Sequence, residues 1–149
     1  MKTKLDDRDW ELLGLLQRDA RASFSELARE LAMSAPAVAE RVRRLEDAGV
    51  IRGYRAELDL EKLGLTVLAI VRLKYPTNDY GPLEKVLKQR PELLECHHVT
   101  GEDCFVVKVA CTSMEHLERV TGALGRIGST TTSVVFSTKL QHREIVPFK

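Results

Sequence analysis

The segment from residue 23 to residue 54 constrains the fold more than any other part of this 149-residue chain. Ser23 and Glu26 have the spacing of a capping box, in which a hydroxyl and a carboxylate each bond the other residue's backbone amide. After a short interval, Ser34 can cap a second helix, and Pro36 fits the first turn of that helix. The segment therefore predicts two short helices joined by a tight turn and followed by the start of a β-hairpin.

The apolar positions of the second helix indicate which of its faces meets the core. Val38, Val42 and Leu45 are spaced i, i+4 and i+7, which places them on one buried stripe. A helix that enters the major groove needs a slim N-terminal end for the base edges and cations further along for phosphates. Both features lie away from the stripe. We therefore expect double-stranded DNA to contact Ser34, Ala35, Pro36, Ala37, Glu40, Arg41, Arg43, Arg44 and, on the hairpin, Arg52.

The charged run at residues 41–46 has a second interpretation. Taken alone, it is as consistent with an ordinary solvent-exposed helix face as with a nucleic-acid contact. The capped helix pair before it and the expected hairpin after it favour DNA binding. Upstream, an aspartate at residue 6 or 7 can cap a first helix, whose expected core residues are Trp10, Leu13 and Leu16, with Leu12 as a further candidate.

The rest of the chain has the pattern of a second domain. Segments with strand periodicity alternate with segments of helix periodicity. We expect strands at 66–73, 93–100, 105–111 and 130–140, a helix at 82–89 and a second helix capped by Ser113. The order βαββαβ is the ferredoxin-like pattern. The predicted fold class is α+β, with an N-terminal winged helix-turn-helix at residues 1–61 followed by a ferredoxin-like βαββαβ domain at residues 62–149.

The chain resembles the Lrp/AsnC family of bacterial and archaeal regulators, the feast/famine proteins, over nearly its whole length. The matching residues are Leu5-Asp6, Asp9, Asp19, Arg21, Ser25–Ala28, Glu40–Glu46, Gly49–Ile51, Gly53-Tyr54, Leu63-Gly64 and Glu95–Glu102. One departure is that many members carry two prolines at the start of the recognition helix, where this chain has only Pro36. The resemblance implies a transcriptional regulator that forms a homodimer, assembles further to an octamer or similar ring, and responds to a small amino acid.

Two polar segments of the second domain are candidates for binding such an effector. An amino acid needs acceptors or an anion for its ammonium, and amides or hydroxyls for its carboxylate. The residues alone favour a simpler interpretation, in which the first segment is a hairpin turn and the second a run of strand formers. The resemblance favours a site, because family effectors bind at this turn, at contacts between dimers. The candidates are Thr100, Gly101, Glu102, Asp103, Cys104, Thr131, Thr132 and Ser133.

Composition narrows the remaining possibilities. The net charge is only +1, so any positive field must be local. No apolar run approaches 18 residues and the N-terminus lacks an apolar stretch, so we expect neither a membrane span nor a secretory signal. The three cysteines form no CxxC motif, which fits a reducing cytoplasm. We expect no metal or cofactor, because the adjacent His97 and His98 point to opposite faces of a strand.

An enzyme is the less favoured class. Ferredoxin-like domains related to this family also occur in tetrapyrrole decarboxylases, and His97, His98 and Arg126 leave that possibility open. The recognition helix keeps its cations and its small N-terminal residues, which such an enzyme would not need. No catalytic triad or phosphate-binding loop is visible in the sequence. A third possibility is a DNA-binding assembly protein without an effector. We therefore expect a regulator rather than an enzyme.

Overall fold

Helices form the first part of the chain, and an antiparallel sheet forms most of the second. The computed structural model describes residues 4–101 and 104–148. Its internal contacts divide the chain into two units, Met1–Glu57 with Leu140–Lys149, and Leu58–Lys139. The division expected from the sequence placed the C-terminal residues in the second domain, whereas the contacts group them with the first unit. No described helix has both the length and the apolarity that a membrane crossing requires.

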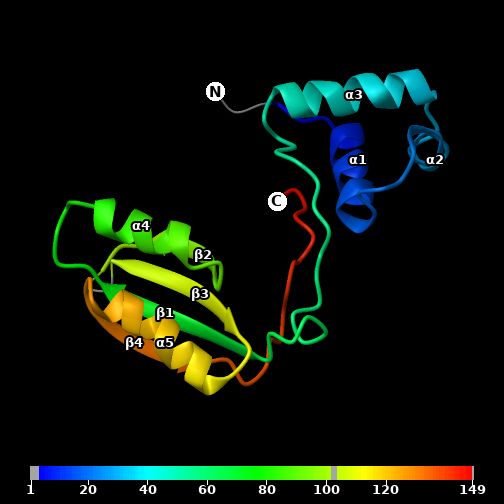
Figure 1. The fold of residues 1–149 in the computed structure, drawn as a ribbon. Helices are drawn as coiled ribbons and strands as arrows, with labels where there is room; N and C mark the ends of the chain where they lie inside the picture. The colour runs from blue at the N-terminus through cyan, green and yellow to red at the C-terminus, as the bar shows by residue number, and fades with distance from the viewer. Residues whose placement is uncertain (1–3, 102–103, 149) are drawn as a thin grey trace. The chain divides into compact units, whose positions relative to one another are not determined.

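Three helices build the first unit, drawn in blue to cyan in Figure 1: α1 (Asp7–Arg18), α2 (Phe24–Glu30) and α3 (Ala35–Asp47). The capping box of Ser23 and Glu26 is confirmed, because each side chain bonds the other residue's backbone N–H. Ser34 caps α3 as predicted, and its hydroxyl accepts the Ala37 N–H at 3.4 Å. The core consists of Leu12, Leu27, Ala28, Leu31, Val38, Val42 and Leu45, all buried.

The turn between α2 and α3 and the end of α3 follow the sequence signals. Ala32 adopts a left-handed φ of 50°, and the Met33 N–H then bonds the Ala28 carbonyl at 2.9 Å. Gly49 has a φ of 68°, a conformation that glycine adopts without steric cost. This turn lets the Val50 N–H reach back to the Leu45 carbonyl at 2.9 Å, just after α3 ends at Asp47.

The buried face of α1 differs from the expected one. Leu12 is fully buried, whereas Trp10, Leu13 and Leu16 are only partly so. The physical reason is Asp9, which is also fully buried and pairs with arginines of α3. The side of α1 that carries Asp9 and Leu12 therefore faces α3, and the apolar stripe is rotated relative to the prediction.

The segment after α3 also differs from the expected hairpin. Residues 48–66 contain no β-strand, and residues 52–58 form no backbone hydrogen bond with one another. Ile51 still packs against the core of the first unit. The extended backbone beyond it finds no strand partner among the described residues, which is why the two strands of the wing do not form there.

The second unit has the predicted ferredoxin-like order βαββαβ. Its elements are β1 (Val67–Lys74), α4 (Gly81–Gln89), β2 (Leu93–His98), β3 (Phe105–Cys111), α5 (Met114–Gly125) and β4 (Ser129–Val134). All neighbouring strands are antiparallel, in the spatial order β2-β3-β1-β4. Alternate residues of β1 and β3 pack against Leu83 of α4 and against Leu117 and Val120 of α5. Both helices therefore cover the same face of the sheet (Figure 1).

The opposite face of the sheet carries no helix. On β1 it presents Leu68, Ile70 and Arg72, which alternate with the fully buried Ala69, Val71 and Leu73. The last strand is shorter than expected, since β4 ends at Val134 rather than at residue 140. Its partner β1 begins at Val67, so the chain beyond residue 135 has no strand left to pair with.

The C-terminal segment makes specific contacts with α1 inside the first unit. Arg18 donates from Nη1 to both carboxylate oxygens of Glu144, at 2.9 and 3.1 Å. Gln17 bonds both backbone groups of Ile145, at 3.0 Å to the carbonyl and 2.8 Å to the N–H. A Cβ on Gly14 would lie 2.7 Å from Glu144 Oε1, so the absence of a side chain at Gly14 makes room for this carboxylate.

Candidate nucleic-acid interface and effector region

The outer surface of α3 has the composition that a major-groove helix requires. Its buried stripe is the predicted one, with Val38, Val42 and Leu45 at 3% exposure or less. On the other side, Pro36, Glu40 and Arg43 are exposed, as the helical period predicted. The N-terminal turn, Ser34–Ala37, carries no side chain longer than proline, so its backbone can approach a base edge closely.

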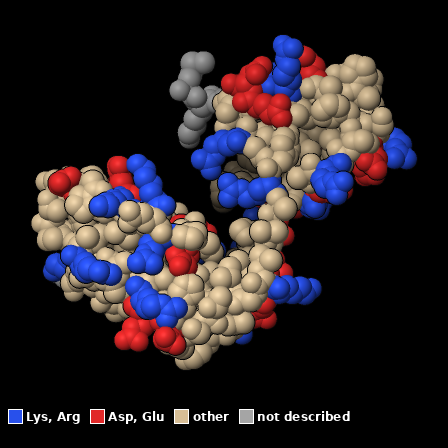
Figure 2. All heavy atoms as spheres, viewed as in Figure 1, with Lys and Arg blue, Asp and Glu red and all other residues tan. Residues whose placement is uncertain are grey.

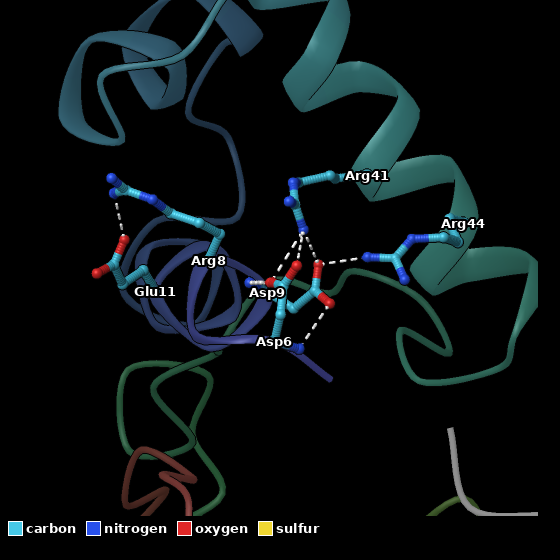
Figure 3. A network of polar contacts seen from close by, with 6 residues as sticks. All are labelled: Asp6, Arg8, Asp9, Glu11, Arg41 and Arg44. Carbon is cyan, nitrogen blue, oxygen red and sulfur yellow. Dashed lines mark hydrogen bonds and ion pairs between the residues drawn. The ribbon is translucent and has the colours of Figure 1, made fainter. Parts of the chain in front are cut away.

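Arg41 is held inside the protein rather than presented outward. Its side chain is 24% exposed, and Nη1 lies 2.8 Å from the Asp6 carboxylate and 2.7 Å from that of Asp9 (Figure 3). The hydrogen bond from Arg41 holds the pKa of Asp6 below its usual value, with a further contribution from the Asp9 N–H. The same two carboxylates raise the pKa of Arg41. Arg41 therefore joins α3 to the start of α1, which disfavours its expected role as a free cation for DNA.

Asp9 is the central residue of this network, although the sequence predicted no functional role for it. It is 0% exposed, and its Oδ1 accepts hydrogen bonds from both Arg41 and Arg44. Its Oδ2 accepts the Asp6 N–H at 3.1 Å, while Asp6 Oδ1 accepts the Asp9 N–H at 2.7 Å. The available signal was the three-residue spacing of the two aspartates, which is that of a capping box. The partners on α3 lie 32 and 35 residues away in the sequence, so a local sequence pattern cannot predict these contacts.

The remaining expected cations are accessible. The Arg43 side chain is 72% exposed, and its nearest ionic partner is Asp47, at 3.8 Å. The Arg44 side chain is 47% exposed and contacts Asp9 at 2.6 Å. Arg52 is exposed on the segment after α3. Figure 2 shows Lys and Arg interspersed with Asp and Glu on the visible face of each unit, which agrees with the small net charge of +1.

The three hydroxyl residues of β4 do not share one face. Thr131 and Ser133 lie opposite Arg72 and Ile70, on the face without helices. Thr132 lies opposite Val71, on the face that the helices cover. All three side chains are exposed, because β4 is an edge strand. Only Thr131 and Ser133 can therefore present two hydroxyls side by side to one ligand group.

The turn between β2 and β3 is the other expected effector segment. Thr100 and Gly101 are exposed, and Gly101 has a φ of 111°, while Glu102 and Asp103 lie outside the described residues. The strand pairs connect Phe105 to Leu73 and Leu73 to Thr130, so this turn and the start of β4 lie at one end of the sheet. They are separated by two strand spacings, about 10 Å. A single chain therefore does not bring the two expected segments into contact.

Cys104 lines a cavity of about 200 Å³ at this end of the sheet. The rings of His98 and Phe105 stack with centroids 4.6 Å apart, and Tyr80 meets Phe105 edge-on at 5.8 Å. The Cys104 thiol donates to the Tyr75 carbonyl at 3.7 Å. The cavity is lined by Tyr75, Pro76, Thr77, Asn78, Tyr80, His98, Cys104 and Phe105. It offers an aromatic environment beside one predicted effector residue.

The histidines of β2 point to opposite faces, as expected. His97 pairs with Glu95 at 3.3 Å on the face without helices, and His98 stacks on Phe105. Arg126 forms the C-cap of α5. Within residues 4–101 and 104–148, no three His, Cys, Asp or Glu side chains are placed to hold a metal ion.

Comparison with known proteins places both units in one family. Residues 5–52 match the family model for winged helix-turn-helix DNA-binding domains, and residues 67–145 match that for the Lrp/AsnC ligand binding domain. The transcriptional regulator LrpC of Bacillus subtilis is 35% identical, over 90% of this chain and 93% of its own. Its solved structure superimposes with a TM-score of 0.87, covering 91% of this chain and 97% of that one.

Two further relatives extend this comparison. The glutamate uptake regulatory protein of Zymomonas mobilis is 32% identical, over 99% of this chain and 93% of its own. The feast or famine regulatory protein of M. tuberculosis, solved in complex with L-methionine, is 32% identical with a TM-score of 0.86, and the match covers 97% of this chain and all of that one. The chain thus belongs to the Lrp/AsnC family of transcriptional regulators.

Proposed function

We propose that this regulator reads specific DNA sites with α3, using Ser34–Ala37 at the base edges and the cations Arg43 and Arg44 at the phosphates. The observation that carries this proposal is the division of α3 into two sides. Val38, Val42 and Leu45 are buried, while Ser34, Pro36 and the two arginines are exposed. Ala35 is only partly exposed, because it packs against the core. Arg41 is left out of these contacts, because it pairs with Asp6 and Asp9 inside the unit. Arg52 adds a cation beyond the end of the helix.

A dimer would present two copies of α3 to the duplex. Two recognition helices related by a two-fold axis meet the same side of DNA when the half-sites are spaced by about 10 base pairs or a multiple of this. The expected operator is therefore pseudo-palindromic. Selection of binding sites from random duplex DNA by the full-length protein measures both the sequence and the spacing. A pool without enrichment would contradict sequence-specific reading.

The two exposed arginines give the matching mutational test. Replacing both Arg43 and Arg44 with alanine should weaken binding at least about tenfold. It should reduce the salt slope of the dimer by about 3.6, because two phosphate contacts are lost from each of the two recognition helices. The control replaces Arg8 and Arg119, which are exposed cations on α1 and α5, paired with Glu11 and Glu115. That control removes the same charge without altering α3. An unchanged affinity in the first variant would exclude this helix face.

We further propose that a small amino acid regulates the protein through its second unit. Several groups at one end of the sheet suit such a ligand. Gly101 presents its backbone amide without a side chain, and Thr131 with Ser133 offers two hydroxyls on one face. The aromatic cavity beside Cys104 suits an apolar side chain. The L-methionine complex of the mycobacterial relative supports this ligand class.

The two groups of residues would meet across two copies of the chain. Within one chain they lie two strands apart, so a pocket that uses both needs the turn of one copy and the β4 segment of a neighbour. The sheet face without helices, with Leu68 and Ile70 on β1, and the fully exposed Phe136 provide apolar surface for such assembly. A homodimer that assembles to an octamer or similar ring would satisfy both requirements.

Calorimetry of the full-length protein against the twenty amino acids tests the effector proposal. Binding of at least one of them is expected, accompanied by a change in sedimentation. By linkage, saturating DNA must change the ligand affinity by the same factor by which the ligand changes the DNA affinity. If none binds at millimolar concentration, the second unit is an assembly module without an amino-acid effector. A strictly monomeric protein at tens of micromolar would contradict the assembly proposal.

A further inference from the structure

The three arginines of α3 are held in three different ways. Arg41 lies within a pair of carboxylates, with 24% of its side chain exposed. Arg43 extends into solvent, at 72% exposure. Arg44 is intermediate, at 47% exposure, and a single nitrogen, Nη2, contacts Asp9 Oδ1 at 2.6 Å. Arg44 therefore has one end on a buried carboxylate and the rest of its guanidinium accessible.

The carboxylate that holds Arg44 is itself fixed. Asp9 is 0% exposed and also accepts hydrogen bonds from Arg41 and from the Asp6 N–H (Figure 3). A guanidinium is planar and carries five N–H donors in a rigid fork, so holding one nitrogen restricts the directions that the other donors can take. The remaining N–H groups of Arg44 have no partner within the described residues.

We propose that Asp9 is a positioning residue for DNA binding, which orients Arg44 so that one edge of the guanidinium stays on Asp9 and the free edge meets a DNA phosphate. The inference rests on the proposed function, in which this side of α3 faces the duplex. A preoriented arginine loses less side-chain freedom when it binds, and it offers two parallel hydrogen bonds to a phosphate. Arg43, which has no such anchor, supplies charge alone.

A positioning role for Asp9 and simple electrostatics predict opposite changes in DNA affinity when the Asp9 charge is removed. If Asp9 only adds negative charge near the DNA, Asp9→Asn should tighten binding, because phosphates repel a carboxylate. If Asp9 positions Arg44, the same variant should weaken binding, although it makes the protein more positive. Tighter binding by folded Asp9→Asn protein would overturn the proposal.

Lysine substitutions distinguish the orientation of an arginine side chain from its charge. They also do not depend on whether the Asp9 variant folds. A lysine keeps the charge but cannot bridge two oxyanions with a rigid plane. Arg44→Lys should therefore weaken binding about tenfold, whereas Arg43→Lys should weaken it only about twofold. Both variants should keep the wild-type salt slope. Arg8→Lys on α1 controls for the substitution itself and should leave the affinity unchanged.

A double-mutant cycle completes the test, with DNA affinity measured by titration of the selected operator and folding checked by thermal melting. In an Asp9→Asn background, Arg44→Lys should cost no more than about twofold, because the anchor is already gone. Equal losses for Arg43→Lys and Arg44→Lys in the wild-type background would overturn the proposal. If the double alanine variant weakens binding but Arg44→Lys does not, only this inference fails. If the double alanine variant binds normally, the proposed function itself fails.

Discussion

The two units of this regulator differ in how they present their functional residues. In the first unit, the expected DNA contacts lie almost entirely on α3, and a buried carboxylate on α1 holds two of its arginines. In the second unit, the expected effector residues lie in the turn at one end of the sheet and along β4, two strands away. The proposed contacts to one DNA half-site thus lie within one folded chain, whereas the proposed effector pocket needs residues of a neighbouring copy. Ligand binding in such a pocket would depend on the assembly of the chains as well as on the ligand concentration.

The largest expected effect tests whether the two units have independent cores. Leu45→Ala in the first unit and Leu73→Ala in the second each remove a fully buried side chain. Each should lower the free energy of unfolding of its own unit by about 2–5 kcal/mol, because a cavity remains after truncation. Scanning calorimetry should show one transition moving in each variant while the other stays in place. A common shift of both transitions would show that the units unfold as one.

An intermediate effect is expected at the effector region, where the strand period offers a matched pair. Thr131→Val should weaken amino-acid binding about tenfold, because a hydroxyl that bonds a carboxylate is lost. Thr132→Val makes the same chemical change on the face that the helices cover, and should change ligand affinity little. Calorimetry with the best-binding amino acid measures both variants, and DNA affinity without ligand should be unaffected. Equal effects at the two positions would argue against the face assigned to the ligand.

The smallest expected effects concern pH, and they should be alike in the two units. The pKa of Asp6 is lowered chiefly by its hydrogen bond from Arg41, and that of Glu95 chiefly by its hydrogen bond from Lys108. A lowered pKa in the folded state stabilises the protein above the ordinary carboxyl value, about 4, and this contribution disappears as the pH falls through the lowered value.

Melting temperatures of Asp6→Asn and Glu95→Gln variants, measured from pH 2 to pH 8, test this expectation. Each variant should be less stable than the wild type at neutral pH, and the difference should vanish in acid. Between pH 6 and pH 8 the difference between Asp6→Asn and the wild type should not vary with pH, because the Asp6 carboxylate stays ionised throughout this range. A difference that grows as the pH falls would reverse the assigned sign.

The features that sequence predicted well depend on neighbouring residues. The caps of Ser23 and Ser34, the glycine that ends α3 and the βαββαβ order all follow from patterns a few residues long. The features that sequence missed depend on distant partners. The rotation of α1 and the pairing of Arg41 with Asp6 and Asp9 follow from contacts between residues 32 and 35 positions apart. Similarly, β4 ends where β1 no longer pairs with it. The expected wing likewise requires a strand partner, which residues 48–66 do not provide.

The contacts between α1 and the C-terminal segment set an order of events during synthesis. Glu144 follows Arg18 by 126 residues, so at typical translation rates it emerges from the ribosome roughly 6–25 s later. The three helices and their core are already present by then, because they lie within the first 47 residues. We therefore expect a nascent chain to hold a folded helix-turn-helix well before Glu144 and Ile145 dock on it. The DNA-binding unit thus begins to fold before the second unit and is completed after it.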